Sequence, residues 1–213
     1  KMKNLALING KPLIYYSIKA AKDSKMFDKV IINSDSIIFK KIADKYGVNF
    51  YHRPKNLGSS ETKSDEVVAD FTRNNPCDII SWVNPIAPLQ NGDLIKNIMQ
   101  YFQSECLDTL HTVKDQQVHC NYKDEPLNYK TDQVFARTQD LIPVQAFVYT
   151  MMVWRTQSFI SNYKKTRRGI FSGNVGYYVV DKISSTIIKN SQDLFLAESL
   201  LIQKSSNNNS KSK

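Results

Sequence analysis

The sequence is poor in cysteine and lacks any long apolar run. Its 213 residues include three cysteines, Cys77, Cys106 and Cys120, an odd number without CxxC spacing. That pattern argues against a disulfide framework and against a zinc site, so we expect reduced thiols and a cytoplasmic protein. No stretch of about 18 apolar residues is present, so the sequence predicts no transmembrane helix and no membrane partner.

The start of the sequence shows no secretory signal. Lys1-Met2-Lys3 leads straight into a structured pattern, without the apolar core of a signal peptide. Lys1 is not an initiator methionine, so the sequence leaves open whether further residues precede it.

Histidine is also scarce, and charge is unbalanced. His52, His111 and His119 lack the spacing of metal ligands, and 29 Lys and Arg outnumber 20 Asp and Glu for a net charge of +9. Local positive excess occurs only at YKKTRRG (residues 163–169) and in the tail. No zinc finger or helix-turn-helix pattern accompanies it. A solvated basic surface or an anionic small-molecule ligand is therefore favoured, and a nucleic-acid partner is the weakest alternative.

Apolar periodicity alternates between strand and helix over the first half of the chain. β-branched runs predict strands at 28–35, 48–54, 77–84 and 106–113, and helical spacing predicts helices near 12–27, 36–47, 62–73 and 91–103. Gly47 is expected to end the second helix and Asp93 to cap the fourth. This alternation predicts an α/β fold with right-handed crossovers and a mostly parallel sheet.

The rhythm breaks after about Lys114. Residues 115–170 are polar and irregular in large part and predict an excursion from the sheet, of a kind that often forms dimer contacts. Strand-like segments return at 148–154 and 176–181, and helical ones at 155–163 and 191–203. We therefore expect one domain over residues 1–203 and a disordered polar tail over 204–213.

Polar residues follow three of the predicted strands. Ligands of an open parallel sheet bind beyond the carboxyl ends of its strands, where the sequence places Asp35, Arg53 and Asn84. Pro85 would hold Asn84 extended with its amide toward the crevice, although a ligand-free connector is the alternative. Arg53 suits a phosphate or carboxylate, or else a surface ion pair. Asp35 suits a ribose, a metal or a helix cap.

Several motifs in order resemble those of the N-acylneuraminate cytidylyltransferases, the CMP-sialic acid synthetase family. They are KNLALINGKPLIYYSIKAA, FDKVIINSDSIIFKKIADKYGV, RPKNL, VNPIAPLQNGDLI, RTQDL and DLFLAESLL, and the similarity extends to about Gln203. The resemblance implies a three-layer, Rossmann-like fold of the nucleotide-diphospho-sugar-transferase type, with a small dimerisation excursion. It also implies transfer of CMP from CTP to an acidic nine-carbon sugar, with release of pyrophosphate.

The resemblance carries site residues with it. Lys3 and Asn4 match the family's Lys-Asn at the nucleotide site, and Ser64 and Asn84 match further nucleotide-site positions. The family usually has Gln where Asn84 stands, so the amide is kept but shortened. Arg137 of RTQDL matches an arginine near the sugar carboxylate, for which a guanidinium fork is suited. We expect Asn84, Arg53 and Arg137 to converge over one cleft.

Three departures from the family bear on catalysis. A Gly-Ser-Lys-rich phosphate loop precedes Lys-Asn in the family, and here both truncation and true loss remain open. Mg²⁺, which the family uses, is held there by an Asp-x-Asp pair whose positions are occupied by Ile187 and Lys189. Sugar-contacting positions fall near Val148 and Met152, which are apolar and would leave sugar hydroxyls unpaired.

Two functions of different classes follow. The first is a divergent cytidylyltransferase that binds CTP and an acidic, sialic-acid-like sugar for surface glycan synthesis, as a homodimer. The second is a family-like scaffold that has lost catalysis and serves as a binding partner, with Lys189 filling an abandoned corner. No residue of the sequence predicts a general base.

Overall fold

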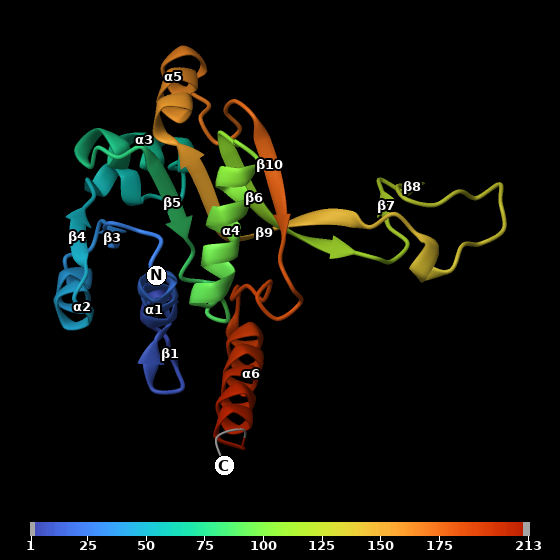
Figure 1. The fold of residues 1–213 in the computed structure, drawn as a ribbon, viewed down its shortest axis with the longest axis horizontal. Helices are drawn as coiled ribbons and strands as arrows, with labels where there is room; N and C mark the ends of the chain where they lie inside the picture. The colour runs from blue at the N-terminus through green and yellow to red at the C-terminus, as the bar shows by residue number, and fades with distance from the viewer. Residues whose placement is uncertain (1–2, 211–213) are drawn as a thin grey trace.

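The structure, a computed structural model, describes residues 3–210, with side chains to residue 203 (Figure 1). Its central sheet has the strand order β10-β6-β9-β5. The bounds are β5 Ile79–Val83, β6 Thr109–Gln116, β9 Val144–Arg155 and β10 Val175–Val179. β10 runs parallel to β6, whereas β9 runs antiparallel to both β5 and β6. The predicted α/β fold is confirmed, and the central sheet is mixed because β9 returns from the excursion between two parallel strands.

Shorter ladders complete the strand content. β3 and β4 form a separate parallel pair that covers Ile31–Ser34 and Asn49–His52. Two hairpins are formed by β1 with β2 and by β7 with β8. Their bounds are β1 Leu7–Ile8, β2 Lys11–Pro12, β7 Asn121–Tyr122 and β8 Glu125–Pro126. Three 3₁₀ turns are assigned at Lys3–Leu5, Lys55–Gly58 and Thr138–Asp140.

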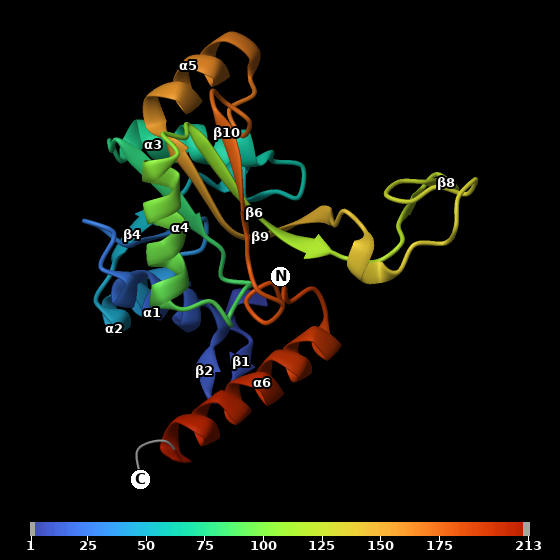
Figure 2. The ribbon, with the colours of Figure 1, turned by 45° about the vertical axis from the view of Figure 1, so that its right-hand side comes forward.

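Helices cover both faces of the sheet and make three layers. Their bounds are α1 Leu13–Ser24, α2 Ile38–Tyr46, α3 Ser64–Asn74, α4 Gly92–Ser104, α5 Thr156–Thr166 and α6 Ser191–Ser210. α4 packs with α1 against one face, and α3 packs with α5 against the other. α2 packs on β3 and β4, and α6 lies along the β1–β2 hairpin (Figure 2).

Residues 150–154 of strand β9 are mostly apolar because both faces of the strand are buried there. Val148, Met151 and Val153 belong to the core under α4, whereas Met152 and Trp154 belong to the core under α3 and α5. A strand buried on both faces reads as a continuous apolar run. The apolar side chains at positions 148 and 152, which suggested an altered sugar pocket, are therefore core residues.

Helix ends follow the expected chemistry with one correction. Gly47 ends α2 in the left-handed conformation, with φ of 63° and its N–H donating to the Ala43 carbonyl, as predicted. The expectation that Asp93 caps α4 is wrong. Asn91 is the N-cap, and its Oδ1 accepts a hydrogen bond from the Leu94 amide at 2.8 Å. Asn and Asp are equally good caps, so sequence alone does not decide between neighbours.

Gly92 allows α4 to approach α1 closely. A Cβ at this position would lie 2.8 Å from backbone atoms of Asp23 and Ser24, which cannot move aside as a side-chain tip can. Gly92→Ala is therefore expected to lower the free energy of unfolding by about 1–3 kcal/mol, the usual cost of overpacking. Urea denaturation measures this. Asn97→Ala, an exposed change in the same helix, is the control and should be neutral or slightly stabilising; equal costs for both variants would contradict the close-packing argument.

The excursion and the tail differ from their predicted limits. Residues 117–143 project from the body as an arm (Figure 1), but from Val144 onward the chain re-enters the sheet as β9, which narrows the predicted range of 115–170. Within the arm, the rings of His119 and Phe135 stack with their centroids 4.0 Å apart. α6 continues through Ser210, where the sequence predicts a disordered tail from residue 204, and residues 211–213 lie outside the described residues.

Candidate functional site

Three segments that are distant in sequence meet beyond the carboxyl end of β5. The amide of Asn84 donates to the Thr150 carbonyl at 3.0 Å, and the amide of Ile188 donates to the Ile86 carbonyl at 2.8 Å. The ammonium group of Lys3 donates to the Ile188 carbonyl at 3.3 Å. Backbone bonds thus tie the Asn84 corner to the segment before α6, and Lys3 closes the group from the start of the chain.

The Asn84 corner is rigid because its polar groups are bonded locally. Oδ1 of Asn84 accepts from the Ile86 amide at 3.3 Å, and its carbonyl accepts from the Ala87 amide at 3.2 Å. Nε2 of Gln90 donates to the same carbonyl at 2.9 Å. The side-chain oxygen of Asn84 is therefore used within the turn. Its side-chain nitrogen, Nδ2, is the group of Asn84 that is suited to bind a ligand.

Gln90 is a functional candidate that the sequence analysis missed. Its side chain is only 5% exposed, yet its Oε1 atom is buried without a hydrogen-bond partner. An unpaired buried acceptor costs about 1–3 kcal/mol, so a ligand donor at this point would relieve it. The sequence offered one signal: Gln90 is a single polar residue between Pro88-Leu89 and the helix cap Asn91.

The segment before α6 does not offer metal ligands. Ile187 packs against the core under α4, and the Lys189 side chain is exposed. The carboxylate of Asp193 accepts from the Lys189 and Asn190 amides at 2.7 and 3.0 Å, and Oδ1 of Asn190 accepts from the Asp193 amide at 3.0 Å. This reciprocal pair caps the start of α6. Within residues 3–210, no group of three or more His, Cys, Asp or Glu is placed to hold a metal ion. A hard divalent cation needs oxygen ligands, so these residues do not fit Mg²⁺.

The second carboxylate of the DLFLAE motif is also used structurally. Oε1 of Glu198 accepts from the Asn9 amide at 2.6 Å, which ties α6 to the β1–β2 turn. The hydroxyl of Tyr16 donates to the Ile8 carbonyl in the same corner at 2.8 Å, and burial raises the pKa of Tyr16 to about 12. The DLFLAE motif therefore holds α6 against the β1–β2 hairpin.

Arg53 forms an ion pair with Asp35. Its Nη2 donates to Oδ1 of Asp35 at 3.3 Å, and its side chain is 16% exposed. Gly58 lets the chain pass close to Asp35, since a Cβ there would collide with that carboxylate. Nε of Arg53 is buried without a partner. Asp35 serves as the partner of Arg53, so the ion-pair interpretation of Arg53 describes the structure.

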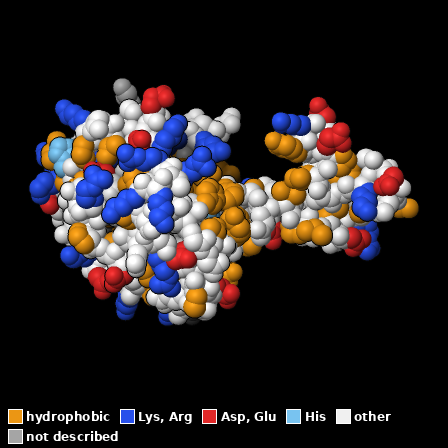
Figure 3. Space-filling model, turned by 90° about the horizontal axis from the view of Figure 1, so that it is seen from above, with side chains coloured by type: hydrophobic (Ala, Val, Ile, Leu, Met, Phe, Trp, Pro, Cys, Tyr) orange, Lys and Arg blue, Asp and Glu red, His pale blue; other side chains and the backbone are white. Residues whose placement is uncertain are grey.

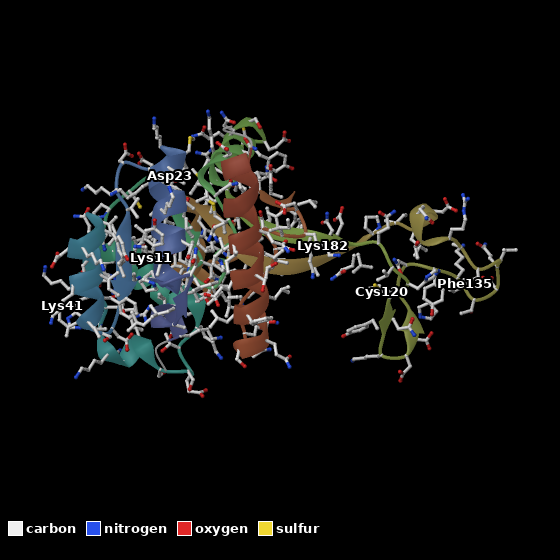
Figure 4. All side chains as sticks on the ribbon, turned by 90° about the horizontal axis from the view of Figure 1, so that it is seen from below. Lys11, Asp23, Lys41, Cys120, Phe135 and Lys182 are labelled. Carbon is white, nitrogen blue, oxygen red and sulfur yellow. The ribbon has the colours of Figure 1, made fainter. Side chains whose placement is uncertain are left out.

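Of the other predicted site residues, Asn4 lies next to Lys3 in sequence, whereas Ser64 and Arg137 lie on other elements. Asn4 is half-buried beside Lys3, and Ser64 is the exposed first residue of α3. Arg137 is 80% exposed on the arm, where it pairs with Asp140 at 2.8 Å. Figure 4 shows how far the arm, marked by Phe135, extends from the body. The expected convergence therefore fails for Arg137 within one chain, because the excursion folds outward.

The most deeply buried titratable ring lies on β6. His111 is 1% exposed, and its Nε2 donates to the Ile170 carbonyl at 3.0 Å, which leaves Nδ1 buried without a partner. The rings of Phe147 and Phe171 lie 5.4 and 4.7 Å away. Burial lowers the pKa of His111 below its ordinary value of 6.5, although the hydrogen bond to Ile170 acts in the opposite direction.

This lowered pKa predicts a loss of stability in acid. The unfolded chain takes up a proton at His111 before the folded chain does, so the free energy of unfolding is expected to fall as pH drops below 6.5. Urea denaturation between about pH 7.5 and about pH 5.5 measures the slope. His111→Gln keeps a donor but cannot titrate, and it should flatten the slope in this range. An unchanged slope would show that other groups cause the acid sensitivity.

A family model described as Cytidylyltransferase matches residues 1–166. The N-acylneuraminate cytidylyltransferase of Streptococcus agalactiae serotype V is 29% identical over 155 residues, which cover 67% of this chain and 37% of that protein. The pseudaminic acid cytidylyltransferase of Campylobacter jejuni subsp. jejuni is 35% identical over 106 residues, 47% of this chain and 46% of that protein. The matched part thus spans less than half the length of these relatives.

Solved structures support the fold. A CMP:2-keto-3-deoxy-manno-octonic acid synthetase complexed with CTP superimposes with a TM-score of 0.69 and covers 95% of this chain and 92% of its own. Its sequence identity of 12% shows likeness of fold alone. In the part of the chain that the structure describes, no helix is both long and apolar enough to cross a membrane.

Proposed function

The chain belongs to the cytidylyltransferase family, and we propose that it transfers CMP from CTP to an acidic nine-carbon sugar of the sialic- or pseudaminic-acid type. Pyrophosphate is the second product, and the CMP-sugar serves surface glycan synthesis. The sugar class is supported by the names of the two relatives. Three free cysteines favour a cytoplasmic location.

One observation carries the proposal: Lys3, the Asn84 corner and the segment around Ile188 are joined into one site. Lys3, Asn4, Ser64 and Asn84 are the nucleotide-binding residues that the family resemblance assigns, and the joined segments support Lys3 and Asn84. We add Gln90, because its unpaired Oε1 can accept a hydrogen bond from an amino or hydroxyl group of the nucleotide.

Phosphate charge is the main chemical problem at this site. CTP carries several negative charges, and the residues at positions 187 and 189 do not suit Mg²⁺. The ammonium group of Lys3 donates to the Ile188 carbonyl, and Lys189, whose side chain is exposed, is the next residue in the sequence. In our proposal these two lysines neutralise the phosphates electrostatically, and no reaction step depends on a metal ion.

The reaction is an in-line displacement. A sugar hydroxyl oxygen attacks the α-phosphorus, the new P–O bond forms, and the bond to the pyrophosphate oxygen breaks; the hydroxyl proton passes to solvent. No residue of the site is assigned as a general base. Positioning of the two reactants and neutralisation of charge supply the rate enhancement, as in phosphoryl transfer.

The sugar subsite requires a second copy of the chain. Arg137 is assigned to the sugar carboxylate, but its arm carries it away from the Asn84 corner of its own chain. An exposed aromatic cluster lies where the arm joins the body, with Phe147 packed on Tyr149 and Tyr177 at 5.7 and 5.8 Å. Exposed apolar patches mark interfaces, so we propose a homodimer in which each arm reaches the partner's site.

The test is pyrophosphate release from CTP, followed with a coupled phosphate assay and a panel of sialic, pseudaminic and related keto acids. The proposal expects release that requires both CTP and one of these sugars. Release with a neutral sugar, or no release with any member of the panel, would contradict it.

A catalytically silent scaffold is the second candidate. Two observations favour it: Ile187 is partly buried against the core under α4, and the Asp193 carboxylate takes part in capping α6. Isothermal calorimetry separates the candidates, because a scaffold of this kind binds CTP weakly or not at all, whereas the enzyme binds CTP before the sugar is added.

A further inference from the structure

The YKKTRRG segment is the one strongly basic motif that the proposed site leaves unused. Its residues form the last turn of α5 and the residues that follow, and α5 packs beside α3. A hollow of about 540 Å³ lies between the two helices. Its floor is formed by Ala69, Ile160 and Tyr163, and its rim carries Arg73, Lys164 and Arg167.

The hollow is distinct from the CTP site. A second hollow of about 760 Å³ shares Ile160 and Lys164 with the first and is lined by Asp78, which directly precedes β5. Asn84 directly follows β5. The six residue-to-residue steps from Asp78 to Asn84 along an extended strand span about 20 Å, so the basic hollow and the nucleotide corner lie at opposite ends of β5. Figure 3 looks onto the basic end and shows Lys and Arg side chains gathered over the body.

Charge at the hollow is uniformly positive. In the described part of the chain, no carboxylate lines it. Two carboxylates of α3 have other partners: Asp65 accepts from the Gly169 and Ile170 amides, and Asp70 accepts from the Tyr51 hydroxyl. All three rim cations are exposed, and the chain as a whole carries a net charge of +9. An occupant must therefore be anionic, and a second copy of this basic chain is disfavoured.

The aromatic ring of the floor argues against a nucleobase. Tyr163 stacks on Phe159 with ring centroids 6.1 Å apart and planes 17° apart. The guanidinium group of Arg167 lies 5.5 Å from the Tyr163 centroid. Proteins bind single-stranded nucleic acids by stacking the bases on open aromatic faces. The Tyr163 ring is already in contact with Phe159 and Arg167, so it does not offer an open face. Ala69 and Ile160 offer an apolar surface that suits an aliphatic side chain.

We propose that the groove between α3 and α5 docks an acidic segment of a partner protein, with its carboxylates on Arg73, Lys164 and Arg167 and an aliphatic side chain on Ala69 and Ile160. Arginine guanidinium groups bind carboxylates through bidentate hydrogen bonds. Grooves between helices bind amphipathic segments, whose apolar side chains anchor them. The proposal does not depend on the proposed catalytic function.

The probe is a fluorescein-labelled peptide of about 16 residues with glutamates and two leucines in helical spacing. Anisotropy is expected to show binding that weakens as salt is raised. The triple variant Arg73→Glu, Lys164→Glu, Arg167→Glu is expected to lose about tenfold or more in affinity. A peptide with serine in place of both leucines should also bind more weakly. Equal binding of the serine peptide would overturn docking of an amphipathic segment.

The matched control reverses three exposed lysines elsewhere, Lys29→Glu, Lys41→Glu and Lys96→Glu. This variant has the same net charge as the groove variant, so it should keep its affinity for the peptide. Equal losses in both variants would mean non-specific attraction and would overturn the proposal, as would tighter binding of a single-stranded oligonucleotide at the same groove. CTP calorimetry on the groove variant should give an unchanged affinity, which keeps this test separate from that of the nucleotide site.

Discussion

Replacement of Asn84 by aspartate is expected to weaken CTP binding about 10- to 100-fold, which corresponds to about 1.4–2.8 kcal/mol. Aspartate keeps an Oδ1 acceptor for the Ile86 amide, so the corner should retain its turn. It replaces the amide nitrogen, the free donor of the site, with an anionic oxygen beside the phosphates. Donor loss and charge repulsion act in the same direction. Isothermal calorimetry with CTP measures the change, and thermal unfolding checks that the fold is intact.

Asn91→Asp is the matched control for this change. Asn91 lies in the same connection and uses its Oδ1 in the same way, as an acceptor for the Leu94 amide at the start of α4. Aspartate is as good an N-cap as asparagine, so CTP affinity should be nearly unchanged. Similar losses for both variants would place the effect in the stability of the connection and would remove Asn84 from the nucleotide site.

The elements of the fold were predictable because local signals agreed with the global structure. β-branched runs, helical spacing and the glycine at position 47 all favoured the observed strands and helices. The order of the strands in the sheet could not be predicted from the sequence. β9 lies between β5 and β6 in the sheet although it follows both in the chain, and long-range pairing of this kind leaves no local pattern. Its continuous apolar run signals burial on both faces, which sequence alone did not separate from an altered pocket.

The candidate site was predictable only in part, for the same reason. Asn84 could be found because a proline follows it at the end of an apolar strand. The contact between Lys3 and Ile188 joins residues 185 positions apart and had to await the structure. Gln90 was missed because a single polar residue in a loop has no distinctive spacing. Arg137 lies on the arm, and its separation from Asn84 depends on the direction of the arm, which no motif encodes.

The charge at position 189 gives the sharpest test of how the site handles phosphate. Lys189→Asp in the presence of EDTA is expected to weaken CTP binding by about tenfold or more, because an anion replaces the cation that we propose to face the phosphates. Lys189→Ala should lose less than this. Added Mg²⁺ should then restore much of the affinity of the aspartate variant, since a carboxylate with nucleotide phosphates is the usual magnesium environment. Mg²⁺ should change the wild-type affinity little.

Lys182 provides a matched control for Lys189. Lys182→Asp makes the same change at an exposed position in the same connection (Figure 4), so it should alter CTP affinity little with or without Mg²⁺. Ile187 is left intact because it packs, partly buried, against the core under α4, where a carboxylate would cost stability. Strong Mg²⁺ dependence in the wild type would contradict neutralisation by lysine. Unchanged affinity of Lys189→Asp in EDTA would mean that this lysine does not meet the phosphates, and that the positive charge of the site comes from Lys3 without it.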